Sequence, residues 1–196
     1  MAKKSEKKPL VFKNDDIKVV LLHEGAKIPE KGTERASGYD IVNPYRQELI
    51  VGRSLIKTGL KKQPADPLRD LDVRPRSGMS CKGFEVTVEQ YNRNMELIKV
   101  HHKMRVDADV LLGLGDNDYT GEYSLLMRNT GVILVDGMAY KNFFPSESNV
   151  RFFIEPGVKM AQIKFNKVIE HNDFVVVDEL DETERGEGGY GHTDKK

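Results

Sequence analysis

Short apolar runs alternate with polar positions along most of the chain. In "FEVTVEQY" (84–91), Phe84, Val86 and Val88 occupy every second position, a period that is typical of a strand with one face in the core. Comparable runs recur at 17–22, 48–52, 123–127, 132–135, 150–154, 160–165 and 174–177. Turn signals separate them: "NPYR" (43–46), "NTG" (129–131), "VDG" (135–137) and "EPG" (155–157). This pattern predicts an all-β sandwich or barrel.

Two segments do not fit this pattern simply. Between residues 90 and 109, Leu97, Val100, His101 and Met104 fall at helical spacing, but the same stretch also reads as two strands. Both interpretations stay open there. The stretch "NFFPSESN" (142–149) is expected to be an exposed loop inside a strand pair.

Composition narrows the class of protein. At 196 residues the chain is long enough for one well-buried domain. Lys+Arg and Asp+Glu both count 31, so the net charge is +0, which argues against a general nucleic-acid binder. The single cysteine excludes a disulfide framework and a cysteine metal cluster. No apolar run is long enough to span a membrane, so we expect a cytoplasmic protein without membrane contact.

Five short motifs carry the candidate chemistry. They are "ASGYDI" (36–41), "RPRSGMS" (74–80), "GLGDNDYTGEY" (113–123), "PGVKMAQIKF" (156–165) and "RGEGGYGHTDKK" (185–196). The second motif offers guanidinium groups, a hydroxyl and a backbone N–H that can clamp a phosphate. The third is expected to form the tip of a hairpin. It has the Asp-rich, Gly-rich character of a calcium loop, but no helix pattern follows it, which disfavours that interpretation. Each motif alone is weak evidence.

In this order, the five motifs resemble those of the trimeric dUTP diphosphatases (dUTPases), and the resemblance covers residues 17–193. The related dCTP deaminases share the fold and three of the motifs but typically lack the tyrosine loop and the glycine-rich arm. The resemblance implies an all-β, jelly-roll-like (β-clip) homotrimer with active sites between subunits. It also implies hydrolysis of dUTP to dUMP and pyrophosphate, with Mg²⁺ held mainly by the triphosphate and water rather than by protein ligands.

The resemblance assigns the catalytic and base-binding roles to the third motif. Asp116 takes the place of the aspartate that orients and deprotonates the attacking water. Tyr119 would pack under the deoxyribose, and backbone groups around Gly113 would pair with the uracil edge. A positioned carboxylate is what the chemistry requires, because water is a poor nucleophile at neutral pH.

The phosphate-binding roles fall on three other motifs. By the same resemblance, Arg76, Ser77 and Gly78 would hold the phosphate chain, and Gln162 matches an amide that meets the phosphate. Asp40 matches a first-motif carboxylate that supports the site. Cationic groups absorb the charge that develops on phosphate oxygens.

The C-terminal segment would close over the substrate. Residues 181–196 are expected to form a flexible lid arm, and residues 1–16 a disordered basic arm, around a β domain at 17–180. In the lid, Arg185 would grip the γ-phosphate, Tyr190 would stack on uracil and Thr193 would touch the terminal phosphate. His192 stands where the family usually has a serine and is a candidate supporting residue.

Several positions depart from the family pattern. Gly115 replaces the usual Ile or Val before the catalytic aspartate, and Lys159 replaces an arginine that is mainly structural, so we expect little effect from it. Segments 90–109 and 139–149 are longer than in the family, as in some phage and bacterial members, and are candidates for contacting a protein partner. Adjacent histidines in the first segment, His101 and His102, are a weak metal signal. These departures leave two alternatives: a pyrophosphatase acting on dCTP or a modified pyrimidine deoxynucleotide, or a non-catalytic regulatory module of the same fold.

Overall fold

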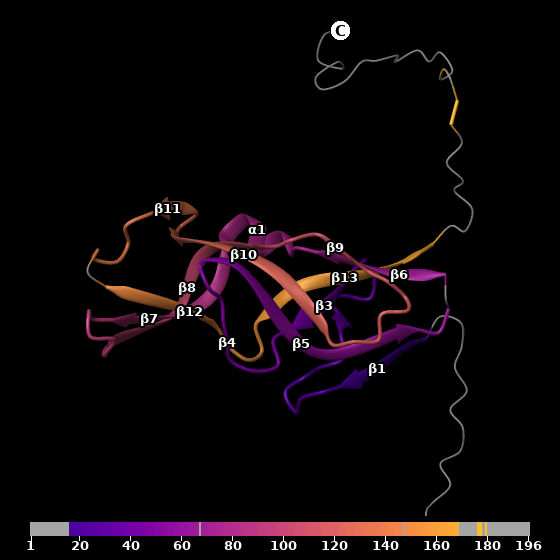
Figure 1. The fold of residues 1–196 in the computed structure, drawn as a ribbon, viewed down its shortest axis with the longest axis horizontal. Coiled ribbons are helices and arrows are strands. Elements are labelled where there is room, and N and C mark those ends of the chain that lie inside the picture. Colours follow the sequence, from indigo (N-terminus) through magenta and orange to yellow (C-terminus); the bar gives the residue numbers. More distant parts are fainter. Residues whose placement is uncertain (1–15, 67, 147, 169–175, 178, 180–196) are drawn as a thin grey trace, which may run out of the picture.

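The structure, a computed structural model, describes residues 16–66, 68–146, 148–168, 176, 177 and 179. Within them the regular structure is strands except for one short helix, as the alternating pattern predicts (Figure 1). The elements are β1 (Ile17–Leu21), β2 (Glu30–Lys31), β3 (Tyr39–Val42), β4 (Gln47–Glu48), β5 (Gly52–Pro64), β6 (Arg69–Arg74), α1 (Ser77–Lys82), β7 (Phe84–Tyr91), β8 (Leu97–Val110), β9 (Gly113–Gly115), β10 (Tyr123–Val135), β11 (Met138–Tyr140), β12 (Asn149–Ile154) and β13 (Lys159–Lys167).

The strands form two sheets. The larger has the order β1-β5-β10-β8-β7-β12-β4, with β11 added to β10, and the smaller has the order β2-β3-β13-β6-β9. Every pairing between described strands is antiparallel. Antiparallel strands with frequent turns are the arrangement that the sequence pattern indicates.

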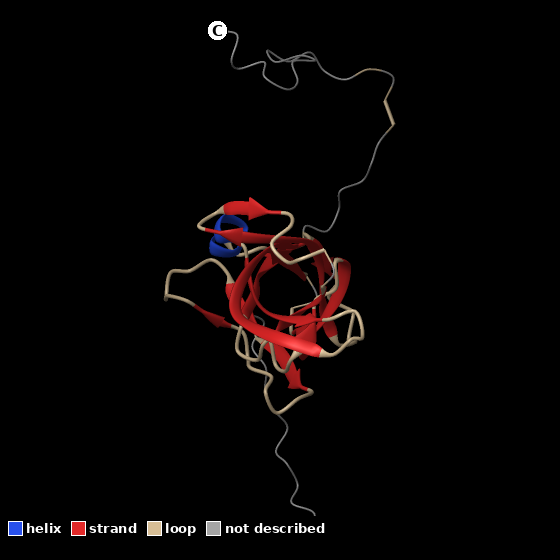
Figure 2. Ribbon diagram, turned by 90° about the vertical axis from the view of Figure 1, so that its left-hand side faces the viewer, coloured by secondary structure: helices blue, strands red, loops and turns tan. Residues whose placement is uncertain are grey.

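The larger sheet closes on itself. β4 lies at one end of the strand order and β5 lies next to the other end, yet only residues 49–51 connect them. A link of that length spans at most about 14 Å, so the sheet must curl until its two ends meet. The Gln47 side chain joins them, since its amide donates to the Lys57 carbonyl at 2.8 Å and accepts from the Lys57 N–H at 2.9 Å. Figure 2 shows the resulting ring of strands, which agrees with the jelly-roll-like fold that we expected.

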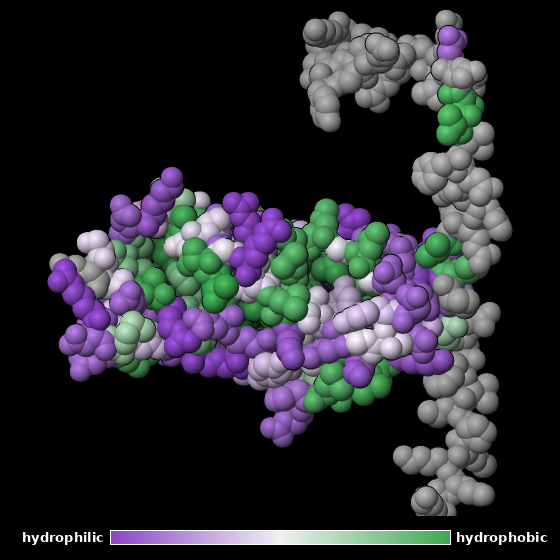
Figure 3. Space-filling view, viewed as in Figure 1, coloured by the Kyte–Doolittle hydropathy of each residue, from purple (hydrophilic) through white to green (hydrophobic). Residues whose placement is uncertain are grey.

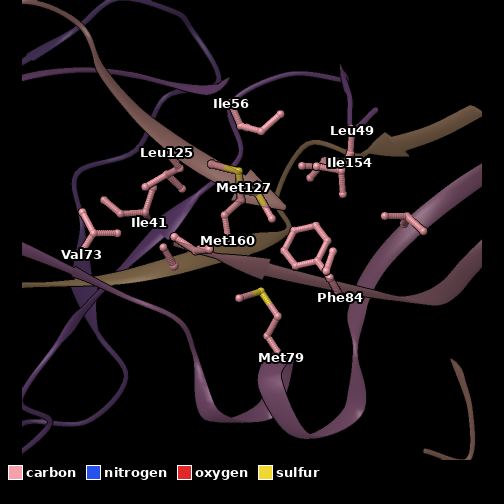
Figure 4. Packing of buried hydrophobic residues seen from close by; sticks show 14 of the residues in the cluster. Ile41, Leu49, Ile56, Val73, Met79, Phe84, Leu125, Met127, Ile154 and Met160 are labelled. Carbon is pink, nitrogen blue, oxygen red and sulfur yellow. The ribbon is translucent and has the colours of Figure 1, made fainter. Parts of the chain in front are cut away.

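The core fills this ring with side chains from both sheets. Ile41 and Met160 come from the smaller sheet, Phe84 and Met127 from the larger, and each is almost fully buried. Met79 of α1 points into the same cluster (Figure 4) and is 5% exposed. This packing fixes the helix that follows the second motif against the body of the domain.

The segment 90–109, for which a helix and two strands were both open, consists of the end of β7, a turn and most of β8. β7 and β8 form a hairpin in which Glu89 pairs with Val100 and Tyr91 with Leu97. The two segments expected to be insertions meet at one end of the molecule, at the left of Figure 1. There Gln90 Nε2 donates to Ser148 Oγ at 2.9 Å, and the His101 ring contacts the Phe144 ring at 5.3 Å. They extend the large sheet, and their role in binding a partner stays a prediction.

One predicted turn is wrong. Residues 129–131 lie inside the continuous strand β10, where the register against β8 shifts between Asn129 and Ile133. Gly131 has a φ of 75°, and the Asn129 side chain accepts a hydrogen bond from its N–H at 2.9 Å. The "NTG" signal therefore marks a β-bulge rather than a chain reversal. The "VDG" turn is confirmed, with φ of 50° at Asp136 and 79° at Gly137 between β10 and β11.

In the part of the chain that the structure describes, no helix is long and apolar enough to cross a membrane. Of the two expected arms, residues 181–196 and all of 1–16 except Asp16 lie outside the described residues.

Candidate active site

Asp40 is the centre of a charged cluster on the smaller sheet. The antiparallel register of β3 and β13 places Gln162 directly opposite Asp40, which is 5% exposed. Arg76 Nε donates to Asp40 Oδ1 at 2.9 Å, and Gln162 Nε2 donates to the same oxygen at 3.3 Å. Lys159 Nζ lies 2.7 Å from Asp40 Oδ2. The structure thus brings together three predicted site residues, and it adds Lys159, which stands where the family pattern has a mainly structural arginine.

The electrostatics of this cluster keep Asp40 charged. Burial by itself raises the pKa of Asp40, but Lys159, Arg76 and Gln162 together outweigh that effect and lower it below its ordinary value. Asp40 therefore acts as a fixed anion that holds two cations in place. The side chains of Arg76 and Lys159 remain 31% and 48% exposed, so an anionic ligand can reach them.

The second motif lies beside a cationic cavity. Ser77 and Gly78 begin α1 and are exposed. A Cβ at Gly78 would meet no atom within 4 Å, so the space in front of this backbone is open. The cavity, of about 720 Å³, is lined on one side by Arg76, Gly78 and Lys159. Strand β8 adds Lys103 and Arg105 to the lining.

The third motif joins the two sheets. β9 pairs with β6, in the register Val73 to Gly113 and Leu71 to Gly115, whereas β10 pairs with β5, β8 and β11. The loop at 116–122 is therefore not the tip of a hairpin, as we had expected, but a connection from one sheet to the other.

Within this loop the two predicted functional side chains face outward. Asp116 and Tyr119 are exposed, and Tyr119 is 50% so. Backbone and side-chain contacts order the loop: the Tyr119 N–H donates to the Asp116 carbonyl at 3.3 Å, and Asn117 Nδ2 donates to the Asp66 carbonyl at 2.8 Å. Gly113, at the start of β9, is exposed as well.

A single chain does not bring Asp116 to the Asp40 cluster. Asp40, Gln162 and Arg74 form one row across the smaller sheet, while Asp116 follows Gly115 four positions further along β6. Strand geometry puts these rows about 13 Å apart along the strands and about 14 Å apart across them, so roughly 20 Å in total. The loop of the third motif and the Asp40 cluster are separate surfaces of one chain.

Sequence reasoning missed one residue beneath the loop of the third motif. Lys62 of β5 is 7% exposed, and its Nζ donates to the carbonyls of Gly115, at 3.2 Å, and Asp116, at 2.8 Å. A lysine at an inward-facing position of a strand would have pointed to this contact, but β5 itself was not predicted from the sequence.

Several predicted residues remain outside this picture. Arg185, Tyr190, His192 and Thr193 lie beyond the described residues, so their roles stay predictions. Among the described residues, no group of three or more His, Cys, Asp or Glu side chains is placed to hold a metal ion.

The two histidines of β8 occupy adjacent strand positions, which face opposite sides of a sheet. Burial, and to a lesser degree Lys99, lowers the pKa of His101, and its ring packs on Phe144. These contacts indicate a packing role for His101.

Comparisons of the sequence and the fold with known proteins indicate the family of this chain. No family model matches the chain. A deoxyuridine 5′-triphosphate nucleotidohydrolase of Fusobacterium nucleatum subsp. nucleatum is 31% identical over 90% of this chain and 95% of its own length.

Solved structures agree on the fold. A mutant of the Staphylococcus bacteriophage 80alpha dUTPase with dUpNHpp superposes with a TM-score of 0.62 at 21% identity, over 91% of this chain and 98% of that one. A mutant of the dUTPase from phage phi11 of S. aureus, whose structure reveals the coordination of a structural Mg(II) ion, superposes with a TM-score of 0.56 at 19% identity, over 85% of this chain and 99% of that one. Given a relative that is similar along nearly its whole length, this chain belongs to the deoxyuridine 5′-triphosphate nucleotidohydrolase (dUTPase) family.

Proposed function

We propose that the chain hydrolyses dUTP to dUMP and pyrophosphate. The observation that carries this function is the similarity to a dUTP nucleotidohydrolase over 90% of the chain. The geometry agrees, because Asp40, Arg76 and Gln162, from three separate motifs, meet beside one cationic cavity.

Asp116 is the general base of the reaction. Its exposed carboxylate accepts a proton from a water molecule, whose oxygen attacks the phosphate chain and breaks the α–β phosphoanhydride bond. The reaction is a hydrolysis without a change of oxidation state: one P–O bond forms, one breaks, and the proton leaves through Asp116. Pyrophosphate departs with the electron pair of the broken bond.

The cationic cavity holds the phosphate chain. Arg76 and Lys159, fixed by Asp40, face the charge on the phosphate oxygens, and Ser77 and Gly78 offer a hydroxyl and an unobstructed backbone. Gln162 stands opposite Asp40 and completes this side.

Mg²⁺ fits as a metal that arrives with the substrate. Both oxygens of Asp40 are occupied by cations and an amide, while Asp116 and Asp118 are exposed. Mg²⁺ keeps several waters and binds through few carboxylates plus substrate phosphates, so this donor set suits it. When bound, the metal neutralises part of the charge on the triphosphate.

Recognition of the base is assigned to the third motif. Backbone groups around Gly113 pair with the uracil edge, and Tyr119 packs under the deoxyribose. A site that pairs with uracil leaves its own polar groups unpaired when cytosine enters, which gives strong discrimination. Pyrophosphate release with dUTP, dCTP, dTTP and UTP tests this assignment. We expect a clear preference for dUTP, and comparable rates with dCTP would reject it.

The role of Asp116 is tested by Asp116→Asn. This variant keeps the shape of the side chain but cannot accept the proton, so we expect turnover to fall by a factor of about 10² to 10⁴. Binding of dUpNHpp, measured by calorimetry, should remain close to wild type. Full turnover in this variant would remove Asp116 from the mechanism.

We assign the active assembly to a homotrimer whose sites combine residues of different copies. The separation of about 20 Å between Asp116 and the Asp40 cluster supports this, because one chain leaves each half of the site without the other. Large apolar side chains are also exposed, among them Leu55 at 68%, Leu112 at 67% and Leu114 at 74%. Figure 3 shows apolar surface over the middle of the face on which Figure 1 places β9 and β10. Such exposure is typical of a surface that a further subunit covers.

Subunit complementation tests the shared site. Asp116→Asn and Arg76→Ala should each be nearly inactive alone. Co-expressed in equal amounts, they should recover about a quarter of the wild-type rate, because a site that draws its two residues from different copies receives both intact in one combination of four. No recovery in verified mixed trimers would mean that both residues act from the same chain. The arm at 181–196 would close the completed site.

A further inference from the structure

Lys62 connects the two sheets beneath the loop that carries Asp116. It lies on β5, where it pairs with Val19 of β1, so its backbone belongs to the larger sheet. Its amine reaches the end of β9 in the smaller sheet and donates to two consecutive carbonyls, of Gly115 and of Asp116. The second of these belongs to the same residue whose side chain we assign as the general base.

Burial of the charged amine of Lys62 is unfavourable unless interactions with other groups compensate for the loss of water. A lysine is almost never fully buried without partners, and Lys62 is 7% exposed. Burial lowers its pKa, while the carboxylates of Asp116, Asp70 and Asp118 act in the opposite direction and favour the charged amine. Two of these three carboxylates, Asp116 and Asp118, belong to the loop itself. The lysine therefore attracts the loop by charge as well as by hydrogen bonds.

Gly115 explains why the loop depends on such a contact. It has no side chain that packs into the core to fix the residue before Asp116. A Cβ at this position would lie 3.1 Å from the Tyr123 ring and 3.4 Å from the Leu71 side chain, so the bare backbone already sits close against the core wall. What remains available for anchoring is the backbone itself, and Lys62 binds its carbonyl.

We propose that Lys62 is a positioning residue for the general base: by holding the carbonyls of Gly115 and Asp116, it fixes the backbone from which the Asp116 carboxylate reaches the attacking water. This inference rests on the function proposed above. It assigns to an amine on β5 the anchoring role that a side chain at position 115 would otherwise fill. A displacement of about 1 Å at a catalytic group is enough to lower a rate about a hundredfold, so loss of the anchor should appear in the chemical step.

The test compares three variants of the full chain. Lys62→Met keeps the length of the side chain and suits the apolar surroundings, but it removes both hydrogen bonds and the charge. Lys62→Arg keeps donors and charge, and the adjoining cavity of about 160 Å³ gives it room. Lys61→Met is the matched control, since Lys61 is the exposed neighbour on the same strand and loses the same charge. For each variant we measure kcat and KM with dUTP, affinity for dUpNHpp and the melting temperature.

We expect Lys62→Met to lower kcat by a factor of about 10 to 100, with KM and dUpNHpp affinity within about threefold of wild type. Lys62→Arg should retain at least several times the kcat of Lys62→Met, and Lys61→Met should match wild type. Folded Lys62→Met with wild-type kcat would overturn the proposal, as would equal losses in folded Lys62→Met and Lys62→Arg. If Lys62→Met does not fold, the comparison of Lys62→Arg with Lys61→Met decides: kcat reduced tenfold or more in the arginine variant rejects the proposal. A wild-type protein that does not hydrolyse dUTP while binding dUpNHpp would instead refute the proposed function.

Discussion

Replacing Asp40 with asparagine removes the anion with which both Arg76 and Lys159 pair. The side chain keeps its shape, but Lys159, at 2.7 Å, and Arg76, at 2.9 Å, are left without an opposite charge. Loss of one partner from a fully buried ion pair costs about 3–5 kcal/mol. Because the two cations are 31% and 48% exposed and regain contact with water, we expect a smaller loss of about 1–3 kcal/mol.

This loss can be measured as thermal and urea unfolding at one fixed protein concentration, since assembly makes stability depend on concentration. A domain of this size loses about 2–4 °C per kcal/mol, so the melting temperature should fall by roughly 2–12 °C. Asp72→Asn is the matched control on the same sheet. Asp72 pairs with Arg74 at 2.7 Å, but Arg74 is 57% exposed, and such surface pairs contribute about 0–1 kcal/mol.

The pH dependence gives this prediction a signature. The folded state lowers the pKa of Asp40 below its ordinary value of 3.8. A carboxyl group with a lowered pKa stabilises the fold above its unfolded-state pKa, and that contribution is lost as the pH falls through the folded-state pKa. The stability gap between wild type and Asp40→Asn should therefore be constant from pH 5 to pH 8 and should narrow below about pH 4. A gap no larger than that of Asp72→Asn at pH 7, or one that widens in acid, would refute the reasoning.

Two further predictions concern α1 and the C-terminal segment. Met79→Ala leaves a cavity under α1 and should lower the free energy of unfolding in urea by about 2–5 kcal/mol. Because α1 carries Ser77 and Gly78, KM for dUTP should rise as well. An unchanged KM would mean that the helix does not take part in phosphate binding. Deletion of residues 184–196, which removes Arg185 and Tyr190, should lower kcat sharply in the pyrophosphate assay without changing the melting temperature, and unchanged turnover would mean that this segment is not a lid.

The strands with clear alternation were predicted, and the long strand β5 was not. Every second residue of β5 from Ser54 to Pro64 faces inward, but that set mixes apolar residues with Ser54, Thr58 and Lys62. Each of these polar groups has a partner: Thr58 donates to the Tyr123 carbonyl, Ser54 accepts from the Ile50 N–H, and Lys62 binds the third motif. Tertiary contacts, which sequence periodicity does not record, make these polar residues compatible with burial.

The bulge in β10 was missed for a related reason. Asn-Thr-Gly is a strong local turn signal, but here Asn129 is 1% exposed and its amide donates to the Leu49 carbonyl at 3.1 Å while accepting from Gly131. A distant strand connection thus keeps β10 continuous.

Part of the candidate site was likewise predicted from the sequence and part was not. Motif order predicted Asp40, Arg76 and Gln162 together, and the register of β3 against β13 places them so. The contact of Lys159 with Asp40 was not predicted, because it joins two residues more than 100 positions apart that only the sheet brings near.

The closure of the larger sheet also has a consequence for biosynthesis. Glu48 of β4 pairs with Phe153 of β12. About 100 residues are added to the growing chain between these two, which takes roughly 5–20 s at ordinary rates of translation. During that interval β4 has no partner strand, and a nascent chain that stops before residue 149 can never join the two ends of the sheet. Proteases and chaperones would therefore encounter a product truncated before residue 149 as an open sheet with unpaired strand edges.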